Sequence, residues 1–167
     1  MKEILVNVER CLSCHSCELA CAVAHSASKT LLGAVGETPN PLKRIFVHSS
    51  HSKNVPISCR HCEEAPCIDA CIAGAMYKTA EGTVTNEGGA GTCTGCWMCV
   101  MVCPYGVIRS EQIISRTAVK CDRKCLDKDG IPACVQACPT GALQFTEVDV
   151  FSFRKRENFV AVFDTAK

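Results

Sequence analysis

The chain has 167 residues, of which 16 are cysteines, and its formal net charge at pH 7 is +1. A chain of this length is typical of one domain, and a charge this close to zero gives no reason to expect a nucleic-acid partner. Residues 1–10 (MKEILVNVER) lack the basic start and apolar core of a secretory signal peptide, and no apolar run approaches the roughly 20 residues that span a bilayer. We therefore expect a cytoplasmic protein without direct membrane insertion, in which thiols at fixed spacing are metal ligands rather than disulfides.

The N-terminal third predicts a strand, a first group of cysteines and an insertion. Residues 4–9 (ILVNVE) are an apolar run of strand length. The first group has the spacing C-x2-C-x2-C-x3-C and consists of Cys11, Cys14, Cys17 and Cys21. Residues 22–58 read as a loop insertion, in which residues 26–43 have the Ser, Gly, Asn and Pro content of a surface loop and residues 44–48 (RIFVH) predict a second strand.

Two further groups lie in the middle of the chain. The second group is Cys59, Cys62, Cys67 and Cys71, and the third, which repeats the spacing of the first, is Cys93, Cys96, Cys99 and Cys103. Between them, residues 76–86 (MYKTAEGTVTN) predict a hairpin that turns at residues 80–82. The glycines of residues 87–91 (EGGAG) lead straight into Cys93 without the helix of a dinucleotide-binding fold, so they predict a turn.

The fourth group, Cys121, Cys125, Cys134 and Cys138, completes an internal repeat. It accounts for the last of the 16 cysteines, and all four groups end in C-x3-C. The last three groups also continue as C-x-x-G-[AV]-aliphatic, for example Cys138-Pro-Thr-Gly141-Ala-Leu143. The glycine allows a bend with positive φ and the alternation after it suits a short strand, so the repeat predicts short strands and turns rather than long helices.

The spacing of the first and third groups points to iron–sulfur clusters. Three thiols in a C-x2-C-x2-C loop lie on one side of a tight turn and suit three corners of an iron–sulfur cube. The C-x3-C spacing amounts to about one helical turn, so Cys99 and Cys103 share a helix face and can reach different metal centres. In bacterial two-cluster ferredoxins the fourth cysteine of this run ligates the other cluster. The spacing therefore predicts three ligands plus one from elsewhere.

Cluster binding would change the charge of the protein. An oxidised cubane with four thiolates carries about −2, so the loaded protein would be acidic although the chain alone is not. Six basic residues lie near the cysteines in sequence and either offset this charge or are ordinary surface residues: Arg10, Arg60, Arg109, Lys120, Arg123 and Lys124.

Zinc is the alternative metal, because Zn²⁺ also binds four thiolates. Its usual pattern is two C-x2-C pairs joined by a spacer, whereas triplets and C-x3-C endings dominate this sequence. The metal content of anaerobically purified protein separates the two. Cubanes require about 16 iron per chain with a similar amount of acid-labile sulfide, and zinc sites require about four zinc and no sulfide.

Nothing else in the sequence suggests catalysis. It has no flavin or nicotinamide signature and no residues arranged as acid, base or nucleophile, so we expect the catalytic subunit to be another protein. Residues 144–167 hold five of the six phenylalanines. They either complete the core as a terminal strand or dock onto a partner, with residues 154–156 (RKR) as a polar rim.

The cysteine groups and their surroundings resemble a known family, the four-cluster ferredoxin-like electron-transfer subunits found with dimethyl sulfoxide reductase, formate dehydrogenase and formate hydrogenlyase. The resemblance spans roughly residues 1–147 and rests on residues 59–67 (CRHCEEAPC), 103–108 (CPYGVI) and 120–143. Within the family, residues 71–76 (CIAGAM) in place of a Cys-Pro run make the chain most similar to the iron–sulfur subunit that serves carbon monoxide dehydrogenase.

The fold implied by this resemblance is an α+β one, in which bacterial ferredoxin-like modules with short strands and short helical turns are nested. The outer module would comprise residues 1–30 and 115–147, and the inner module residues 55–110. The loop insertion would be residues 22–58 and the C-terminal tail residues 148–167.

The function implied by the resemblance is electron transfer through four [4Fe-4S] clusters under anaerobic conditions, from carbon monoxide dehydrogenase to a hydrogenase or a flavin-dependent NAD(P) oxidoreductase. The alternative is an electron-transfer subunit of a formate dehydrogenase, formate hydrogenlyase or other molybdenum or tungsten oxidoreductase. A third interpretation, an iron–sulfur redox sensor or structural module, predicts that the reduced clusters pass electrons to no acceptor enzyme.

The resemblance further implies which thiols share a cluster, with the first group paired to the fourth and the second to the third. Cluster 1 would be held by Cys11, Cys14, Cys17 and Cys138, and cluster 2 by Cys121, Cys125, Cys134 and Cys21. Cluster 3 would be held by Cys59, Cys62, Cys67 and Cys103, and cluster 4 by Cys93, Cys96, Cys99 and Cys71. The family usually has two residues between the thiols corresponding to Cys121 and Cys125, where this chain has three.

Overall fold

The structure is a computed structural model that describes residues 2–111, 113 and 115–164. It is a mixed α+β fold of mostly short elements, as the repeat predicts. In chain order the elements are β1 (Lys2–Val6), the 3-10 helix η1 (Val8–Arg10), α1 (Ser16–Ala24), α2 (Leu31–Gly36), β2 (Ile45–Ser50), β3 (Lys53–Ser58), α3 (Pro66–Asp69), β4 (Tyr77–Lys78), β5 (Val84–Thr85), α4 (Met98–Val102), β6 (Arg109–Ser110), β7 (Ala118–Val119), α5 (Ala133–Gln136), β8 (Leu143–Glu147) and α6 (Val148–Asp164).

The strands form separate antiparallel pairs rather than one sheet. β1 pairs with β8, from Lys2 opposite Glu147 to Val6 opposite Leu143, which brings the two ends of the cysteine-rich region together. The other pairs, β2–β3, β4–β5 and β6–β7, are each formed by strands that are neighbours in sequence. Because a two-stranded ribbon is marginally stable on its own, the packing around these pairs must hold them in place.

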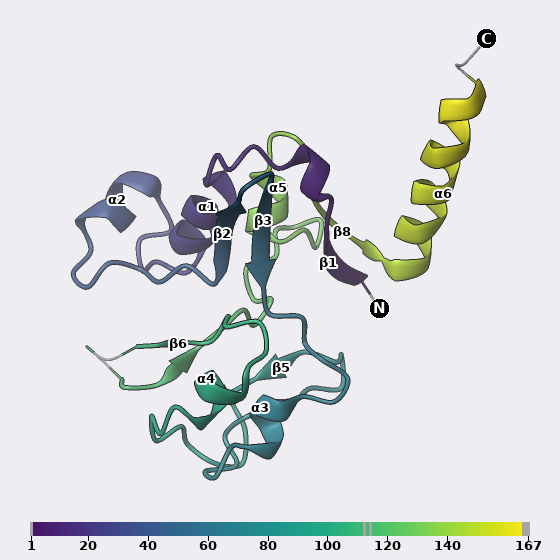
Figure 1. The fold of residues 1–167 in the computed structure, drawn as a ribbon. Helices are drawn as coiled ribbons and strands as arrows, with labels where there is room; N and C mark the ends of the chain where they lie inside the picture. Colours follow the sequence, from purple (N-terminus) through teal and green to yellow (C-terminus); the bar gives the residue numbers. More distant parts are fainter. Residues whose placement is uncertain (1, 112, 114, 165–167) are drawn as a thin grey trace.

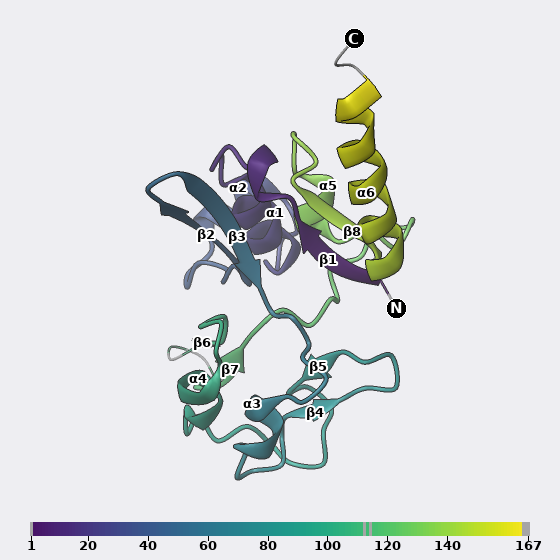
Figure 2. The ribbon, with the colours of Figure 1, turned by 45° about the vertical axis from the view of Figure 1, so that its right-hand side comes forward.

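Two lobes make up the body of the molecule (Figure 1). One holds β1, β8, α1, α2, α5 and the β2–β3 hairpin, and the other holds α3, α4 and the short strands β4 to β7. The chain leaves the first lobe after β3 and returns to it after β7, and these two segments form a narrow connection between the lobes (Figure 2). The second lobe is therefore an insertion in the first. The core of the second lobe includes Ala118, which lies beyond residue 110, where we expect the inner module to end. The bounds of the two modules stay a prediction.

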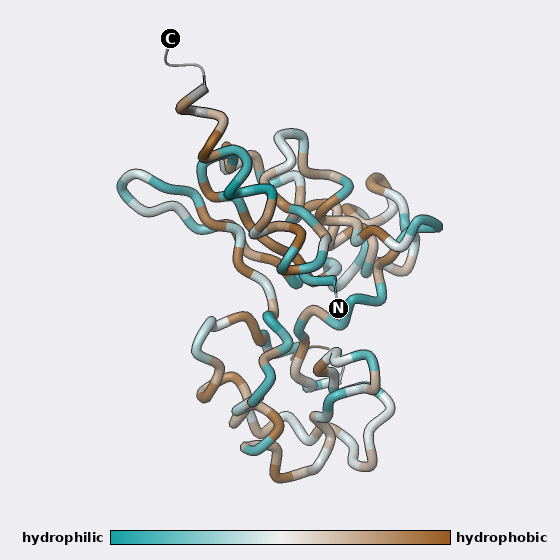
Figure 3. Tube along the Cα trace, turned by 90° about the vertical axis from the view of Figure 1, so that its right-hand side faces the viewer, coloured by the Kyte–Doolittle hydropathy of each residue, from teal (hydrophilic) through white to brown (hydrophobic). Residues whose placement is uncertain are grey.

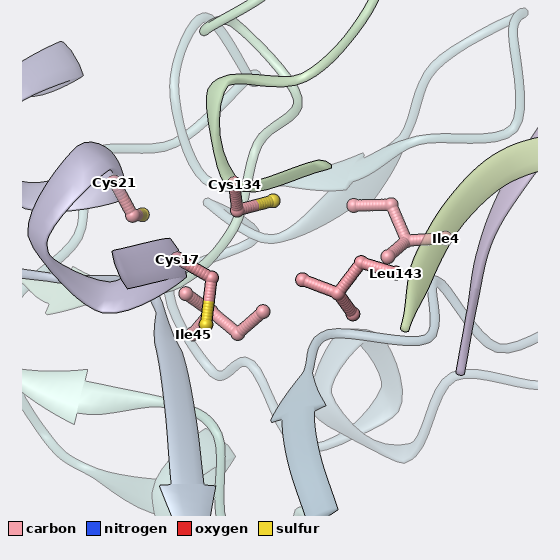
Figure 4. Close-up of a cluster of buried hydrophobic side chains, with 6 residues drawn as sticks. All are labelled: Ile4, Cys17, Cys21, Ile45, Cys134 and Leu143. Atoms are coloured by element: carbon pink, nitrogen blue, oxygen red, sulfur yellow. The ribbon is translucent and has the colours of Figure 1, made fainter. Parts of the chain in front are cut away.

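Each lobe has a small core of its own, and cysteines are part of both. Core 1 comprises Ile4, Cys17, Cys21, Ile45, Cys134 and Leu143 (Figure 4). Core 2 comprises Ala65, Met76, Val84, Cys99, Ile108 and Ala118. Apolar segments are correspondingly divided between the lobes (Figure 3). The interior of each lobe therefore surrounds thiols instead of excluding them.

The strands expected before the third cysteine group are present. Residues 4–9 contain the end of β1 and most of η1, residues 44–48 contain the start of β2, and residues 76–86 contain the β4–β5 hairpin. Within residues 26–43, however, the expectation of a plain surface loop is wrong, because α2 forms there. Thr30 caps this helix, since its side-chain oxygen accepts a hydrogen bond from the Gly33 N–H over 3.3 Å.

The first four residues of the tail, 144–147, lie in strand β8, and Phe145 packs against core 1, so a terminal strand is confirmed for them. From Val148 on, the chain forms helix α6 instead. Arg154, Lys155, Arg156 and Glu157 are good helix formers, and the phenylalanines do not keep the strict alternation of a strand. The helix contacts β1 and β8 and then leads away from the body (Figure 1). None of the described helices, α6 included, has both the length and the apolar character needed to cross a bilayer.

Candidate metal centres

Each cysteine group begins with a loop whose backbone turns at the same place. The residue two positions after the first cysteine has positive φ in all four groups: Ser13 (φ 55°), His61 (φ 46°), Gly95 (φ 68°) and Arg123 (φ 56°). In the first and third groups the residue directly after the second cysteine is also left-handed. This residue is His15 in the first group and Trp97 in the third. Residues other than glycine adopt this backbone conformation at a cost in free energy, so the surrounding structure must enforce it. The four groups thus share a backbone conformation as well as a spacing.

Short helices pair the groups with one another. The third cysteine of each group lies on a helix, namely Cys17 on α1, Cys67 on α3, Cys99 on α4 and Cys134 on α5. The fourth cysteine follows four residues later, which is about one helical turn. Since α1 packs against α5 and α3 packs against α4, the first group lies beside the fourth and the second beside the third.

Two cavities are each lined by four thiols. One is lined by Cys11, Cys14, Cys17 and Cys138, with apolar neighbours that include Val47 and Leu143. The other is lined by Cys59, Cys62, Cys67 and Cys103, with His61 and Lys120 among its other residues. In both cavities three thiols come from one group and the fourth from the paired group. These are the thiols expected to hold clusters 1 and 3, although which cluster each of them binds stays a prediction.

The thiols expected for cluster 2 are neighbours of one another, and all of them except Cys125 are buried. Burial, together with the nearby thiols of Cys121 and Cys125, raises the pKa of Cys21 to about 12. Burial likewise raises the pKa of Cys134, and Cys121, Cys21 and Cys125 add to this effect. The extra residue between Cys121 and Cys125 therefore does not separate either of them from Cys21. The Sγ of Cys21 also accepts a hydrogen bond from the Arg44 N–H over 3.2 Å.

The thiols expected for cluster 4 lie together in the second lobe. Burial raises the pKa of Cys99, and the nearby thiols of Cys93, Cys96 and Cys71 raise it further. The N–H of Met76 donates a hydrogen bond to the Cys71 Sγ over 3.4 Å. Such N–H donors stabilise the thiolate, which is the form that binds a metal.

Comparison with known proteins identifies the family. A family model described as "4Fe-4S dicluster domain" matches residues 51–148, which is more than half of the chain. The chain belongs to the 4Fe-4S dicluster domain family. An iron–sulfur protein of Rhodospirillum rubrum is 41% identical to it over 92% of this chain and 86% of that protein.

Two further relatives show how this 4Fe-4S domain is used elsewhere. The thiosulfate reductase electron transfer subunit PhsB of Salmonella typhi is 32% identical over 87% of this chain and 76% of that protein. The putative oxidoreductase AegA of Escherichia coli (strain K12) is 35% identical over 84% of this chain, which spans only 21% of that longer protein. The chain is thus an iron–sulfur electron-transfer protein rather than a catalytic subunit. None of these three names singles out carbon monoxide dehydrogenase.

The thiol sets fit [4Fe-4S] clusters. A cubane places its iron and sulfide atoms between four thiolates, and shielding from water together with N–H donors to sulfur tunes its potential. The structure supplies sets of four thiols, partly apolar cavity walls, and N–H groups directed at Cys21, Cys59, Cys71 and Cys93. Among the residues that the structure describes, no three Cys, His, Asp or Glu side chains are grouped as a site for a single metal ion. When bound, the clusters supply one-electron redox chemistry, and the chain holds, shields and tunes them.

The four sets follow one another through the molecule. The thiol of Cys17, in the cluster 1 set, is close enough to raise the pKa of Cys134 in the cluster 2 set, after burial and nearer thiols. The thiol of Cys59, in the cluster 3 set, acts in the same way on Cys121, whose pKa burial raises to about 11. The cluster 3 and cluster 4 sets are neighbours because α3, which carries Cys67, packs against α4, which carries Cys99. The spatial order of the sets is therefore 1, 2, 3, 4.

Exposure differs between the ends and the middle of this series. Cys14 and Cys96, in the sets of clusters 1 and 4, are exposed. By contrast, three of the four thiols expected for cluster 2 are buried: Cys21, Cys121 and Cys134. A partner can therefore approach either end of the series, while protein surrounds the middle.

The burial of Lys120 beside a set of four thiols could not be predicted from its neighbours in the sequence. Lys120 is buried, and it lines the cavity of Cys59, Cys62, Cys67 and Cys103. Its ammonium group donates hydrogen bonds to the carbonyl oxygens of Val84 and, over 3.0 Å, Cys121. Lys120 is therefore not an ordinary surface residue, and as a buried cation beside four thiols it is placed to offset their charge when they bind a cluster. Arg123 instead forms an ion pair with Glu3 at the first lobe.

Proposed function

We propose that the protein relays electrons through four [4Fe-4S] clusters, in the order 1, 2, 3, 4, between two redox enzymes that meet its opposite ends. The observation that carries this proposal is the unbroken series of four thiol sets from exposed Cys14 to exposed Cys96. A series with accessible ends and a buried middle suits transfer between partners better than storage or sensing, because both ends can exchange electrons. We further propose that it works in the cytoplasm.

The donor that we propose is carbon monoxide dehydrogenase, and the acceptor is a hydrogenase or a flavin-dependent NAD(P) oxidoreductase. Residues 71–76 (CIAGAM), which replace a Cys-Pro run, support this choice through the resemblance described above. The second candidate is an electron-transfer subunit of another oxidoreductase, such as a formate dehydrogenase. The identity of 32% to a thiosulfate reductase electron transfer subunit favours that candidate.

Anaerobic capture of the tagged protein from its native cells, followed by mass spectrometry, tests the choice of partner. We expect a nickel–iron carbon monoxide dehydrogenase to co-purify, and carbon monoxide to reduce the clusters when that enzyme is added back. Recovery of a molybdopterin or formate enzyme would retain the relay and overturn the assignment of the donor. Capture of no redox enzyme, together with no transfer to any acceptor, would contradict the relay itself.

Helix α6 is expected to bind the partner rather than to support the clusters. It contacts only β1 and β8 strongly among the described elements and lies in neither core. Phe153, Phe159 and Phe163 are 54%, 68% and 66% exposed, which is unusual for large apolar side chains on one helix. Truncation after Glu147 should therefore leave the iron and sulfide content unchanged and abolish co-purification of the partner.

A matched point substitution controls for the length of the truncation. Phe159→Glu should weaken capture of the partner, whereas Leu32→Glu, at an 89% exposed apolar residue on α2, should leave it unchanged. Loss of clusters in the truncated chain would show instead that α6 is needed for folding.

A further inference from the structure

His61 lies between two thiols and is almost completely buried. It follows Cys59 and precedes Cys62, and only 4% of its surface is exposed. It occupies the left-handed position shared by the four cysteine loops, where the other residues are Ser13, Gly95 and Arg123. Ser13 is a small, partly exposed residue that bonds Ser49, and Arg123 bonds Glu3. His61 therefore places a buried imidazole at this position. The loops of Ser13 and Gly95 have no large side chain there, and the loop of Arg123 has an ion-paired arginine.

The hydrogen bonding of His61 fixes which ring nitrogen carries the proton. The Nδ1 atom accepts the N–H of Val84 over 3.0 Å, so in the neutral ring the proton must be on Nε2. The Nε2 atom is buried and has no hydrogen-bond partner in the described part of the chain. A buried donor without an acceptor is costly, which implies an acceptor that is not part of the polypeptide.

The cavity beside His61 indicates that acceptor. His61 lines the same cavity as Cys59, Cys62, Cys67 and Cys103, the four thiols assigned to cluster 3. We propose that the Nε2–H of His61 donates a hydrogen bond to a sulfur of this [4Fe-4S] cluster and thereby raises its reduction potential. The inference rests on the proposed ligand set of cluster 3, but not on the identity of either partner enzyme.

The expected direction follows from charge. Reduction adds an electron to a centre that is already negative, and a donor to sulfur stabilises the reduced form more than the oxidised form. His61 thus gives cluster 3 a different reduction potential from cluster 2. The two clusters are neighbours, because Cys121 of the cluster 2 set lies near Cys59 at the junction of the lobes. The step between the two lobes depends on this difference in potential.

Two substitutions separate the two nitrogens of the ring. In His61→Asn the amide lies where Nδ1 was, so it can still accept the Val84 N–H but cannot reach the position of Nε2. In His61→Gln the amide reaches the position of Nε2 but leaves the Val84 N–H without its acceptor. We expect His61→Asn to lower the midpoint potential of one cluster and His61→Gln to keep it near that of the unsubstituted protein, as measured by redox titration followed by EPR. The affected signal should be the one that is lost in Cys62→Ala.

Measurement on the unsubstituted protein keeps the test independent of folding. With histidine labelled by ¹⁵N, pulsed EPR of the reduced protein should detect a nitrogen coupled to the cluster whose signal is lost in Cys62→Ala, and this coupling should be absent in His61→Asn. Absence of the coupling in the unsubstituted protein would overturn the proposal, as would a lowered potential in His61→Gln but not in His61→Asn. A shift in a cluster other than the one lost in Cys62→Ala would overturn the proposed ligand set instead. The choice of partner enzyme is unaffected by either outcome.

Discussion

Removal of the iron–sulfur clusters is expected to unfold the chain. In the described part of the chain each core has six buried residues, and several of these are the thiols themselves: Cys17, Cys21 and Cys134 in core 1 and Cys99 in core 2. The paired ribbons of strands cannot supply the missing stability, because two-stranded sheets are marginal on their own. Cluster binding should therefore provide most of the folding free energy, as metal binding does in other small metal-binding domains.

The buried thiols add to this dependence. Burial raises the pKa of Cys21 to about 12 and that of Cys121 to about 11, which means that their thiolates are unfavourable in the folded chain without iron. The clusters supply the positive iron that makes these thiolates stable. Without it the chain must bury neutral thiols around the space that the cubanes would fill, and such cavities are costly.

Circular dichroism before and after removal of iron by a chelator under reducing conditions measures the effect. We expect the free energy of unfolding to fall from the about 5–15 kcal/mol typical of native proteins to about zero, and to recover when clusters are reconstituted. Reduced protein that is denatured and refolded without iron serves as the control. Matching spectra of the loaded and cluster-free chains, with a cooperative melting transition in both, would contradict the prediction.

The sequence predicts the parts of the fold that the repeat governs. Gly74, Gly106 and Gly141, which follow the last three cysteine groups at the same distance, all have positive φ between 59° and 63°, as expected for their bends. The C-x3-C endings place the third cysteine of each group on a short helix. Such features are local, so spacing and residue type are sufficient to find them.

Other features depend on contacts that spacing does not encode. Ser13 and His61 take the left-handed conformation although nothing in their residue type requires it, and only the glycine at position 95 signals this shared turn. The burial of Lys120 follows from the return of the chain to the first lobe after β7, which is a tertiary event. The phenylalanines of α6 favour a strand by propensity, yet the helix formers between them prevail.

Two double variants are expected to alter different numbers of clusters, although each removes two thiols from the second lobe. With the ligand sets that we propose, C71A/C93A removes two ligands from cluster 4 alone, because Cys71 lies beside Cys99 and its group. C93A/C103A removes one ligand from cluster 4 and one from cluster 3, because Cys103 lines the cavity of Cys59. If each group held its own cluster instead, the first variant would alter two clusters and the second only one.

Redox titration followed by EPR counts the altered clusters, and iron analysis supports the count. We expect C71A/C93A to lose about 4 of about 16 iron atoms and to retain three unaltered signals, while C93A/C103A changes two signals. The variants control for each other, since they share Cys93→Ala and differ only in the second thiol. The reverse pattern would rule out the crossed ligation of the second and third groups. Because α3 and α4 pack against each other, crossed ligation also means that each cluster ties the two helices together, which a cluster held within one group could not do.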